Sequence, residues 1–183
     1  RKVVVIGGGN VATDNARSSR RLGAEVDMVY RRTREEMPAR DDEFEGCVDE
    51  GVNIRYLLAP KKIETGNDGH RLRITYARMA LGEPDASGRR RPIDTGEEIV
   101  EGVDLVIAAV GQHPRTFEGF GVQTDKKGRI VVREDSLLSS RPGVYAGGDC
   151  VLGPSTLIES VAQGRLAASA MDRQLGGDGD IEE

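Results

Sequence analysis

The feature that most constrains this sequence is its start, where an apolar β-branched run leads directly into a cluster of glycines. Val3 to Ile6 have the composition of a buried parallel strand, and the pattern Gly7-x-Gly9-x-x-Ala12 follows at once and opens a helical repeat. Gly7 permits a tight turn, Gly9 leaves room for a pyrophosphate beside the backbone, and Ala12 lets the helix pack closely on the strand. The N–H groups of the helix N-terminus would face the phosphates. The pattern is typical of a dinucleotide-binding unit.

A short glycine motif also fits an ordinary tight turn between a strand and a helix, so the flanking sequence decides between the two. The helical pattern runs from Asn10 to near Leu22, and Gly23 stands where a helix commonly ends. A second apolar strand follows from Glu25 to Tyr30. Strand, turn, helix and strand therefore occur in the order that nucleotide binding requires, which favours the binding interpretation.

The end of the second strand predicts which dinucleotide is bound. An NAD site usually places an acidic residue about 20 positions beyond the glycines, where it accepts the ribose 2′-hydroxyl. Here the chain has Arg31 and Arg32, whose guanidinium groups suit a 2′-phosphate, whereas a carboxylate would repel it. The sequence therefore predicts NADP(H). The alternative is a solvated basic loop balanced by Glu35 and Glu36.

The remaining pattern predicts an α/β fold, a Rossmann-like parallel sheet in which an antiparallel β-meander replaces one crossover helix, followed by a partial second domain of FAD type. The expected elements of the first domain are a helix from Pro38 to about Glu50 with Phe44, Cys47 and Val48 on its apolar face, a third parallel strand from Asn53 to Leu58, a hairpin through Lys61–Thr65 and Leu72–Tyr76, an exposed loop from Leu81 to Thr95, and an apolar strand from Asp104 to Val110.

A shift in composition near Phe117 predicts a domain boundary. We expect residues 1–115 to bind NADP(H), residues 116–176 to form the C-terminal segment of an FAD-binding domain, and residues 177–183 to be a mobile tail. The second segment predicts short strands at Gly128–Arg133 and Gly143–Ala146. Thr156 and Glu159 form a capping box for a helix that reaches about Leu175.

Composition limits the other functions. The net charge of −5 argues against a general nucleic-acid or anionic-membrane partner. No apolar stretch approaches the roughly 20 residues that cross a bilayer, and no signal peptide is recognisable, so we expect a cytoplasmic protein. Cys47 and Cys150 form neither a C-x-x-C pair nor a metal-ligand cluster, and we predict no metal site. The start at Arg1 leads us to expect a piece of a longer protein.

Several runs resemble one family over almost the whole chain: Val3–Asp14, Tyr30–Ala39, Leu81–Pro92 and the Gly-Gln-x-Pro run from Gly111. They are similar to the small (beta) subunit of NADPH-dependent glutamate synthase, in the pyridine-nucleotide disulfide oxidoreductase superfamily. The resemblance extends to corresponding domains of dihydropyrimidine dehydrogenase and related flavin reductases. In that family the NADPH domain is inserted within an FAD domain, which the chain then returns to complete.

The resemblance implies a set of cofactor-binding residues. In the NADPH domain these are Gly7, Gly9, Asn10 and Val11 at the pyrophosphate, Arg31 and Arg32 at the 2′-phosphate, and Gly111 and Gln112 along the nucleotide cleft. In the returning FAD segment they are Gly148 and Asp149, with Asp149 at the ribityl hydroxyls, and Thr156 and Leu157 close to the flavin.

The implied reaction is hydride transfer from NADPH to FAD, followed by single electrons to iron–sulfur clusters and a partner, such as a large catalytic subunit. The flavin carries that chemistry, so we nominate no catalytic side chain. The family's first FAD glycine motif and its N-terminal cysteine-rich iron–sulfur region are missing from this sequence, and we expect the isolated chain to be incomplete as an enzyme. Two alternatives remain: a nucleotide-binding regulatory domain without redox turnover, and a dithiol reductase, against which the missing C-x-x-C pair argues.

Overall fold

The computed structural model describes residues 1–66, 69–84, 88–115 and 118–181. The chain divides into two compact units, Arg1–Val110 and Gly111–Glu183, which are described separately below. Phe117, near which the composition shift falls, lies outside the described residues. The assignment of 1–115 to NADP(H), of 116–176 to FAD and of 177–183 to a tail stays a prediction.

The first unit is built on a four-stranded parallel sheet with the order β3-β2-β1-β7. Its strands are β1 (Lys2–Ile6), β2 (Glu25–Tyr30), β3 (Asn53–Tyr56) and β7 (Leu105–Ala108). The central strand β1 is apolar because both of its faces are covered. Val3 and Val5 pack into a core with the helices, whereas Val4 and Ile6 pack into a second core on the other face.

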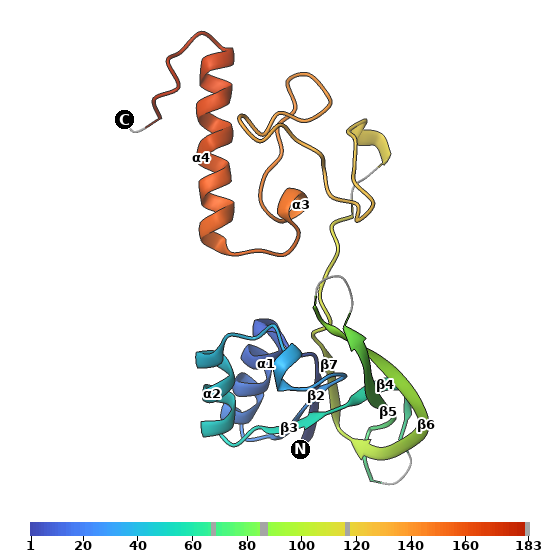
Figure 1. The fold of residues 1–183 in the computed structure, drawn as a ribbon. Helices are drawn as coiled ribbons and strands as arrows, with labels where there is room; N and C mark the ends of the chain where they lie inside the picture. Colours follow the sequence, from blue (N-terminus) through green and yellow to red (C-terminus); the bar gives the residue numbers. More distant parts are fainter. Residues whose placement is uncertain (67–68, 85–87, 116–117, 182–183) are drawn as a thin grey trace. The chain divides into compact units, whose positions relative to one another are not determined.

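Helices α1 (Asn10–Arg21) and α2 (Asp41–Asp49) cover one face of this sheet (Figure 1). The helix predicted from Asn10 to near Leu22 is confirmed, since Leu22 is its C-cap and Gly23 follows with φ of 85°. The start predicted for the second helix at Pro38 is wrong. A short 3-10 turn, η1 (Arg34–Glu36), comes first, and an extended segment precedes α2. Phe44 and Cys47 face the core, but Val48 is 52% exposed, contrary to its predicted place on the apolar face.

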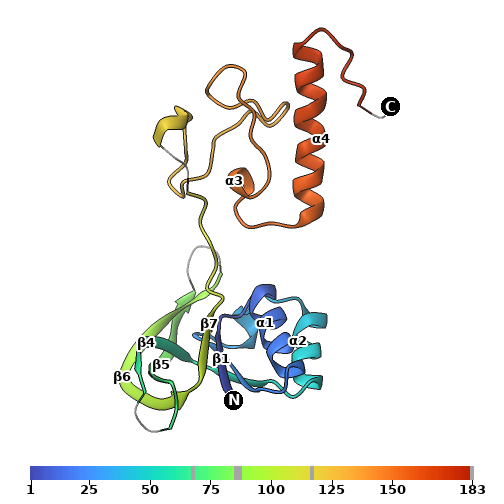
Figure 2. The same ribbon diagram turned by 180° about the vertical axis from the view of Figure 1, so that it is seen from behind.

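The opposite face of the sheet is covered by a three-stranded antiparallel sheet, β4-β5-β6 (Figures 1 and 2). Its strands are β4 (Leu58–Thr65), β5 (Leu72–Pro84) and β6 (Arg90–Val103). Ile74 and Tyr76 of β5 and Val103 of β6 are fully buried against Val4 and Ile6 of the parallel sheet. The predicted β-meander in place of a crossover helix is therefore confirmed. The third parallel strand ends at Tyr56, two residues earlier than predicted, because Leu57 turns the chain with φ of 58°.

The exposed loop predicted from Leu81 to Thr95 is wrong, because β5 and β6 extend into this stretch as a long hairpin. Ala80 pairs with Ile93, and Leu81 pairs with Pro92. Glycine, proline and charge are typical of loops, but a hairpin that projects beyond the core can carry polar residues on both faces. Residues 85–87 of this stretch, and residues 67–68 between the two predicted segments of the first hairpin, lie outside the described residues.

The second unit contains the 3-10 turn η2 (Glu118–Phe120) and the helices α3 (Asp149–Leu152) and α4 (Leu157–Gln174). The capping box of Thr156 and Glu159 is confirmed, and Leu175 is the C-cap. The strands predicted at Gly128–Arg133 and Gly143–Ala146 are wrong, because these segments form only isolated bridges, such as Val132 with Ser139. A strand persists only where a partner pairs along its length. None of the helices in the described ranges combines the length and apolar character that a membrane crossing needs.

Candidate nucleotide-binding site

The glycine-rich loop connects the carboxyl end of β1 to α1 and leaves no space for side chains at its first two glycines. A Cβ atom at Gly7, whose φ is 151°, would stand 2.4 Å from the carbonyl oxygen of Ala109. A Cβ atom at Gly8 would stand 2.5 Å from the ring of Tyr30. At Gly9 it would meet only Pro38, at an ordinary contact distance of 3.6 Å. The backbone of this loop is therefore fixed by its neighbours and open to a ligand only at the helix end.

The N-terminus of α1 has the free donors that an anion needs. The N–H groups of Ala12 and Thr13 both donate to the carbonyl oxygen of Gly9. Within the described ranges, no acceptor meets the N–H groups of Asn10 and Val11, and no side chain caps this 12-residue helix. Uncapped N–H groups and the positive end of the helix dipole together attract phosphate. The Asn10 side chain is used locally, because its Oδ1 accepts from the N–H of Arg40 at 3.1 Å.

The two arginines at the end of β2 differ in their surroundings. Arg31 is exposed, and no residue in the described part of the chain pairs with it. Arg32 is only 9% exposed, and its Nε donates to the carbonyl oxygen of Arg90 at 2.7 Å. Arg34, close by, is held by an ion pair with Asp41 and by the Phe44 ring. Arg31 is thus the available cation at the position where dinucleotide-binding folds read the ribose 2′ substituent.

The carboxylates around these arginines are already paired elsewhere. Glu36 accepts from Arg90 Nε at 2.5 Å and Glu35 from Arg90 Nη2 at 2.6 Å. Sequence analysis missed Arg90 as part of this site. Glu35, Glu36 and Arg90 all lie in runs that carry the family resemblance. The carboxylates and Arg90 are more than fifty residues apart, so no local pattern predicts that they are in contact.

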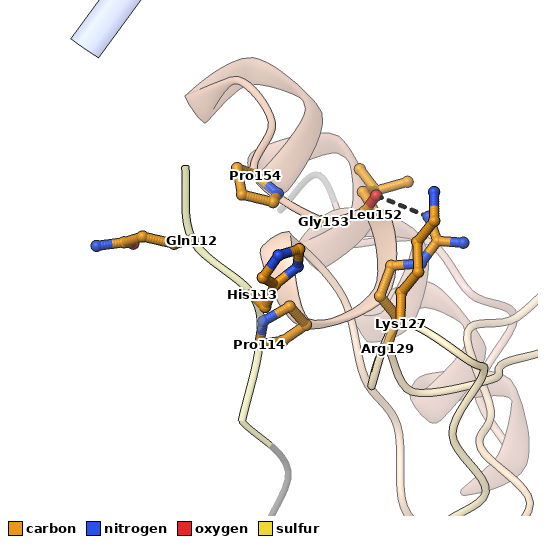
Figure 3. Close-up of a pocket in the computed structure, with 8 residues that line it drawn as sticks. All are labelled: Gln112, His113, Pro114, Lys127, Arg129, Leu152, Gly153 and Pro154. Atoms are coloured by element: carbon orange, nitrogen blue, oxygen red, sulfur yellow. Dashed lines mark hydrogen bonds between the residues drawn. The ribbon is translucent and has the colours of Figure 1, made fainter. Parts of the chain in front are cut away.

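In the second unit, Gly111 has φ of 94°, and Gln112 lines a cavity of about 220 Å³. Figure 3 shows the Gln112 side chain pointing away from the other lining residues, which come from three segments of the chain: His113, Pro114, Lys127, Arg129, Leu152, Gly153 and Pro154. Arg129 donates to the carbonyl oxygen of Leu152 at 3.1 Å and is neutralised by Asp125. The lining of the cavity is mixed polar and apolar, and the Arg129 charge is already engaged.

The residues expected near a flavin lie on one continuous segment of the second unit. Gly148 has φ of 71°, and its N–H donates to Gln163 of α4 at 2.6 Å. Asp149 begins α3, and its carboxylate accepts from the N–H of Ser155 at 3.2 Å. That bond ties Asp149 to the turn before α4, where Thr156 is the N-cap and Leu157 is 80% exposed. The structure therefore brings Gly148, Asp149, Thr156 and Leu157 to one end of α4.

No group of histidine, cysteine and acidic residues in the described ranges could hold a metal ion. Both cysteines are free. Cys47 is fully buried, its Sγ lies 3.7 Å from the carbonyl oxygen of Thr13, and burial raises the pKa of its thiol. A protonated thiol of this kind is a packing group rather than a redox group.

The fold and the loop geometry define a dinucleotide-binding unit, and comparison with known proteins places it in a family. Residues 1–164 match the family model described as pyridine nucleotide-disulphide oxidoreductase, and the chain belongs to that family. Among solved structures, thioredoxin reductase of T. acidophilum superimposes with a TM-score of 0.75 at 25% identity, over 95% of this chain and 52% of that one.

Curated relatives give the more specific similarities. The chain is 45% identical over 176 residues to the NADP(+)-dependent formate dehydrogenase subunit beta of Moorella thermoacetica. It is 38% identical over 179 residues to the glutamate synthase [NADPH] small chain of Escherichia coli. These alignments cover 94% and 93% of this chain, but only 25% and 38% of the relatives' length. The resemblance to the glutamate synthase small subunit is confirmed at the level of the family, which also contains other NADP-linked subunits.

Proposed function

We propose that this chain is the NADPH-binding part of a flavin-linked oxidoreductase, in which hydride passes from NADPH to FAD and electrons continue through iron–sulfur clusters to a partner. The observation that carries the proposal is the presence, in one unit, of an α1 N-terminus without a side-chain cap and of the exposed Arg31 just after β2, which no residue in the described ranges pairs with. The first suits a pyrophosphate and the second suits a 2′-phosphate. Gly7 and Gly9 let the backbone approach the ligand.

A preference for NADPH over NADH follows from the charges. Glu35 and Glu36 both form ion pairs with Arg90, so both carboxylates are engaged by the hairpin and neither pairs with Arg31. Hydrogen bonds to charged groups contribute about 1.5 to 3 kcal/mol, and exposure to water reduces this. We therefore expect NADPH to bind roughly tenfold to a hundredfold more tightly than NADH.

For the flavin, Gly148, Asp149, Thr156 and Leu157 are the proposed ligands from this chain, and FAD would supply the hydride-accepting ring. Apolar side chains along α4 remain open to solvent, among them Ile158 at 80% and Leu175 at 87% exposure. We propose that residues outside this chain cover them and complete the flavin site. The names of the relatives point to different overall reactions, which supports the proposal that a partner subunit sets the electron acceptor. A cytoplasmic location stays a prediction.

The test is calorimetric titration of the 183-residue chain with NADPH and NADH. The unmodified chain should prefer NADPH, and Arg31→Ala should lose most of that preference while its NADH affinity changes little. Arg40→Ala is the matched control, because Arg40 is exposed and paired with Asp42. Equal affinity of the unmodified chain for both nucleotides would contradict the proposal. Tight NADPH binding by a whole protein that never reduces flavin would favour the regulatory alternative.

A further inference from the structure

The start of β6 and the residue before it contact the turn that follows β2. Arg90, the first residue of β6, donates from Nε to Glu36 and from Nη2 to Glu35. Arg89 donates to the carbonyl oxygen of Glu36 at 2.8 Å and to the Tyr30 hydroxyl at 3.2 Å. Two adjacent arginines thus engage one turn through its side chains and its backbone.

Glu36 is the centre of this contact. Only 8% of the residue is exposed, and its carboxylate also accepts from the N–H and the hydroxyl of Thr33, at 3.1 and 2.6 Å. Burial alone would raise the pKa of Glu36, but the hydrogen bonds from Thr33 and Arg90 lower it below its ordinary value. The carboxylate is therefore charged in the folded chain, and a buried charge is tolerated only with such partners.

The same contact reaches the nucleotide site from two sides. The carbonyl oxygen of Arg90 accepts from Arg32 Nε at 2.7 Å, which fixes the side chain next to Arg31. The Tyr30 hydroxyl donates to the carbonyl oxygen of Glu36 at 2.8 Å, while the Tyr30 ring closes over Gly8. Arg89 and Arg90 therefore connect the turn after β2 with Arg32 and, through Tyr30, with the glycine loop.

We propose that Glu36 and Arg90 form a latch that positions Arg31 and Arg32 for a 2′-phosphate, so that the choice between the two dinucleotides depends on a hairpin almost sixty residues downstream. The inference rests on the proposed NADPH site. Glu36 and Arg90 act as positioning residues: a carboxylate would repel the phosphate, and the contacts of the Arg90 guanidinium described above go to Glu35 and Glu36. Glu36 and Arg90 act on the ligand through the position of Arg32. Loss of the latch should therefore weaken binding only of the dinucleotide that carries the 2′-phosphate.

The experiment measures NADP⁺ and NAD⁺ binding to the 183-residue chain by calorimetry for Arg90→Ala, Glu36→Gln and the double variant. Arg90→Ala should weaken NADP⁺ binding about tenfold and leave NAD⁺ within about twofold, since the loss of one charged hydrogen bond between a misplaced arginine and the 2′-phosphate is worth roughly that factor. Because Glu36 and Arg90 act through the same contact, the double variant should lose no more NADP⁺ affinity than the weaker-binding single variant. Arg91→Ala is the control, because Arg91 is the exposed neighbour of Arg90 on the same strand. The Arg91→Ala chain should bind both dinucleotides as tightly as the unmodified chain.

Thermal unfolding without ligand identifies variants that fail to fold. If Arg90→Ala does not fold, Arg90→Lys keeps the charge without the planar fork and should still weaken NADP⁺ selectively. If every folded variant of Glu36 and Arg90 keeps the unmodified preference for NADP⁺ over NAD⁺, the proposed function stands and the latch proposal is wrong. An equal loss of both dinucleotides would also overturn it, because that is the result of a general structural defect. An unmodified chain without preference for NADP⁺ would overturn the proposed function and the latch together.

Discussion

The carbonyl oxygen of Ala109 lies 2.4 Å from the point that a Cβ atom of residue 7 would occupy. Strand β7 pairs with β1, and the Ala109 N–H donates to the carbonyl oxygen of Ile6 at 2.8 Å, which holds the two segments together just before the glycine loop. The tight turn at Gly7 is therefore imposed both by its own φ and by a strand about a hundred residues away.

Gly7→Ala should destabilise the chain and abolish nucleotide binding. A methyl group at this position meets a backbone atom, and φ of 151° strains any L-residue, which costs on the order of 1 to 3 kcal/mol before the clash is counted. Urea unfolding and NADP⁺ titration measure the two effects. Gly164→Ala in α4, where a Cβ meets nothing within 4 Å, is the control and should leave binding unchanged. A Gly7→Ala chain that unfolds and binds normally would contradict this view of the loop.

Acid should weaken the packing of α1 against α2 through Glu50. Hydrogen bonds from Arg21 and Arg17 lower the pKa of Glu50 from 4.5 to about 2. A carboxylate whose pKa falls on folding stabilises the protein above its unfolded pKa, near 4.3, and that stability is lost as the pH falls toward 2. The difference in unfolding free energy between the unmodified chain and Glu50→Gln should therefore be present at pH 7 and shrink between pH 4 and 2.

Glu45→Gln supplies the comparison, because Glu45 is exposed on the same helix and has no partner in the described part of the chain. Its effect on unfolding should be small at every pH. A Glu50→Gln difference that stays constant from pH 7 to 2 would mean that the carboxylate contributes nothing through its charge.

The two cysteines should differ in reactivity and take no part in electron transfer. Cys47 is fully buried with a raised thiol pKa, whereas Cys150 is partly exposed. An aromatic disulfide reagent should modify one thiol in the folded chain and two after unfolding. In a whole protein, Cys47→Ala with Cys150→Ser should leave NADPH-driven flavin reduction nearly unchanged. Loss of reduction in that folded variant would assign a redox role to a thiol.

The isolated chain should fold and bind NADP(H), yet purify without FAD. The proposed nucleotide site lies in the first unit, with its own two apolar cores, whereas the second unit leaves α4 without a buried residue in the described ranges. In the family resemblance, the FAD phosphates are expected to meet a first glycine motif, which this sequence does not contain. An absorbance spectrum checks this prediction. Flavin bands at stoichiometric intensity would show that the residues from Gly148 to Leu157 suffice.

Local sequence signals predicted the fold well where each element depends on its own residues. The boundaries of α1 and β2 follow from apolar periodicity and from Gly23, and the start of α4 follows from a capping box that spans four residues. The hairpin across residues 81–95 was missed because its stability comes from cross-strand partners, while its composition is that of a loop. Arg32 was predicted as a phosphate ligand, and its bond to Arg90 was not, because no local pattern reports a contact across 58 residues.

The late position of the hairpin has a consequence for synthesis on the ribosome. A nascent chain that ends at Pro84 already contains the glycine loop, α1 and Arg31, but it lacks Arg90 and all of β7. Until β6 and β7 emerge, the face of the sheet formed by Val4 and Ile6 lacks Val103, and Gly7 lacks the strand that fixes its turn. Cofactor capture is therefore expected to follow emergence of the last parallel strand, and folding intermediates of this unit should be nucleotide-free.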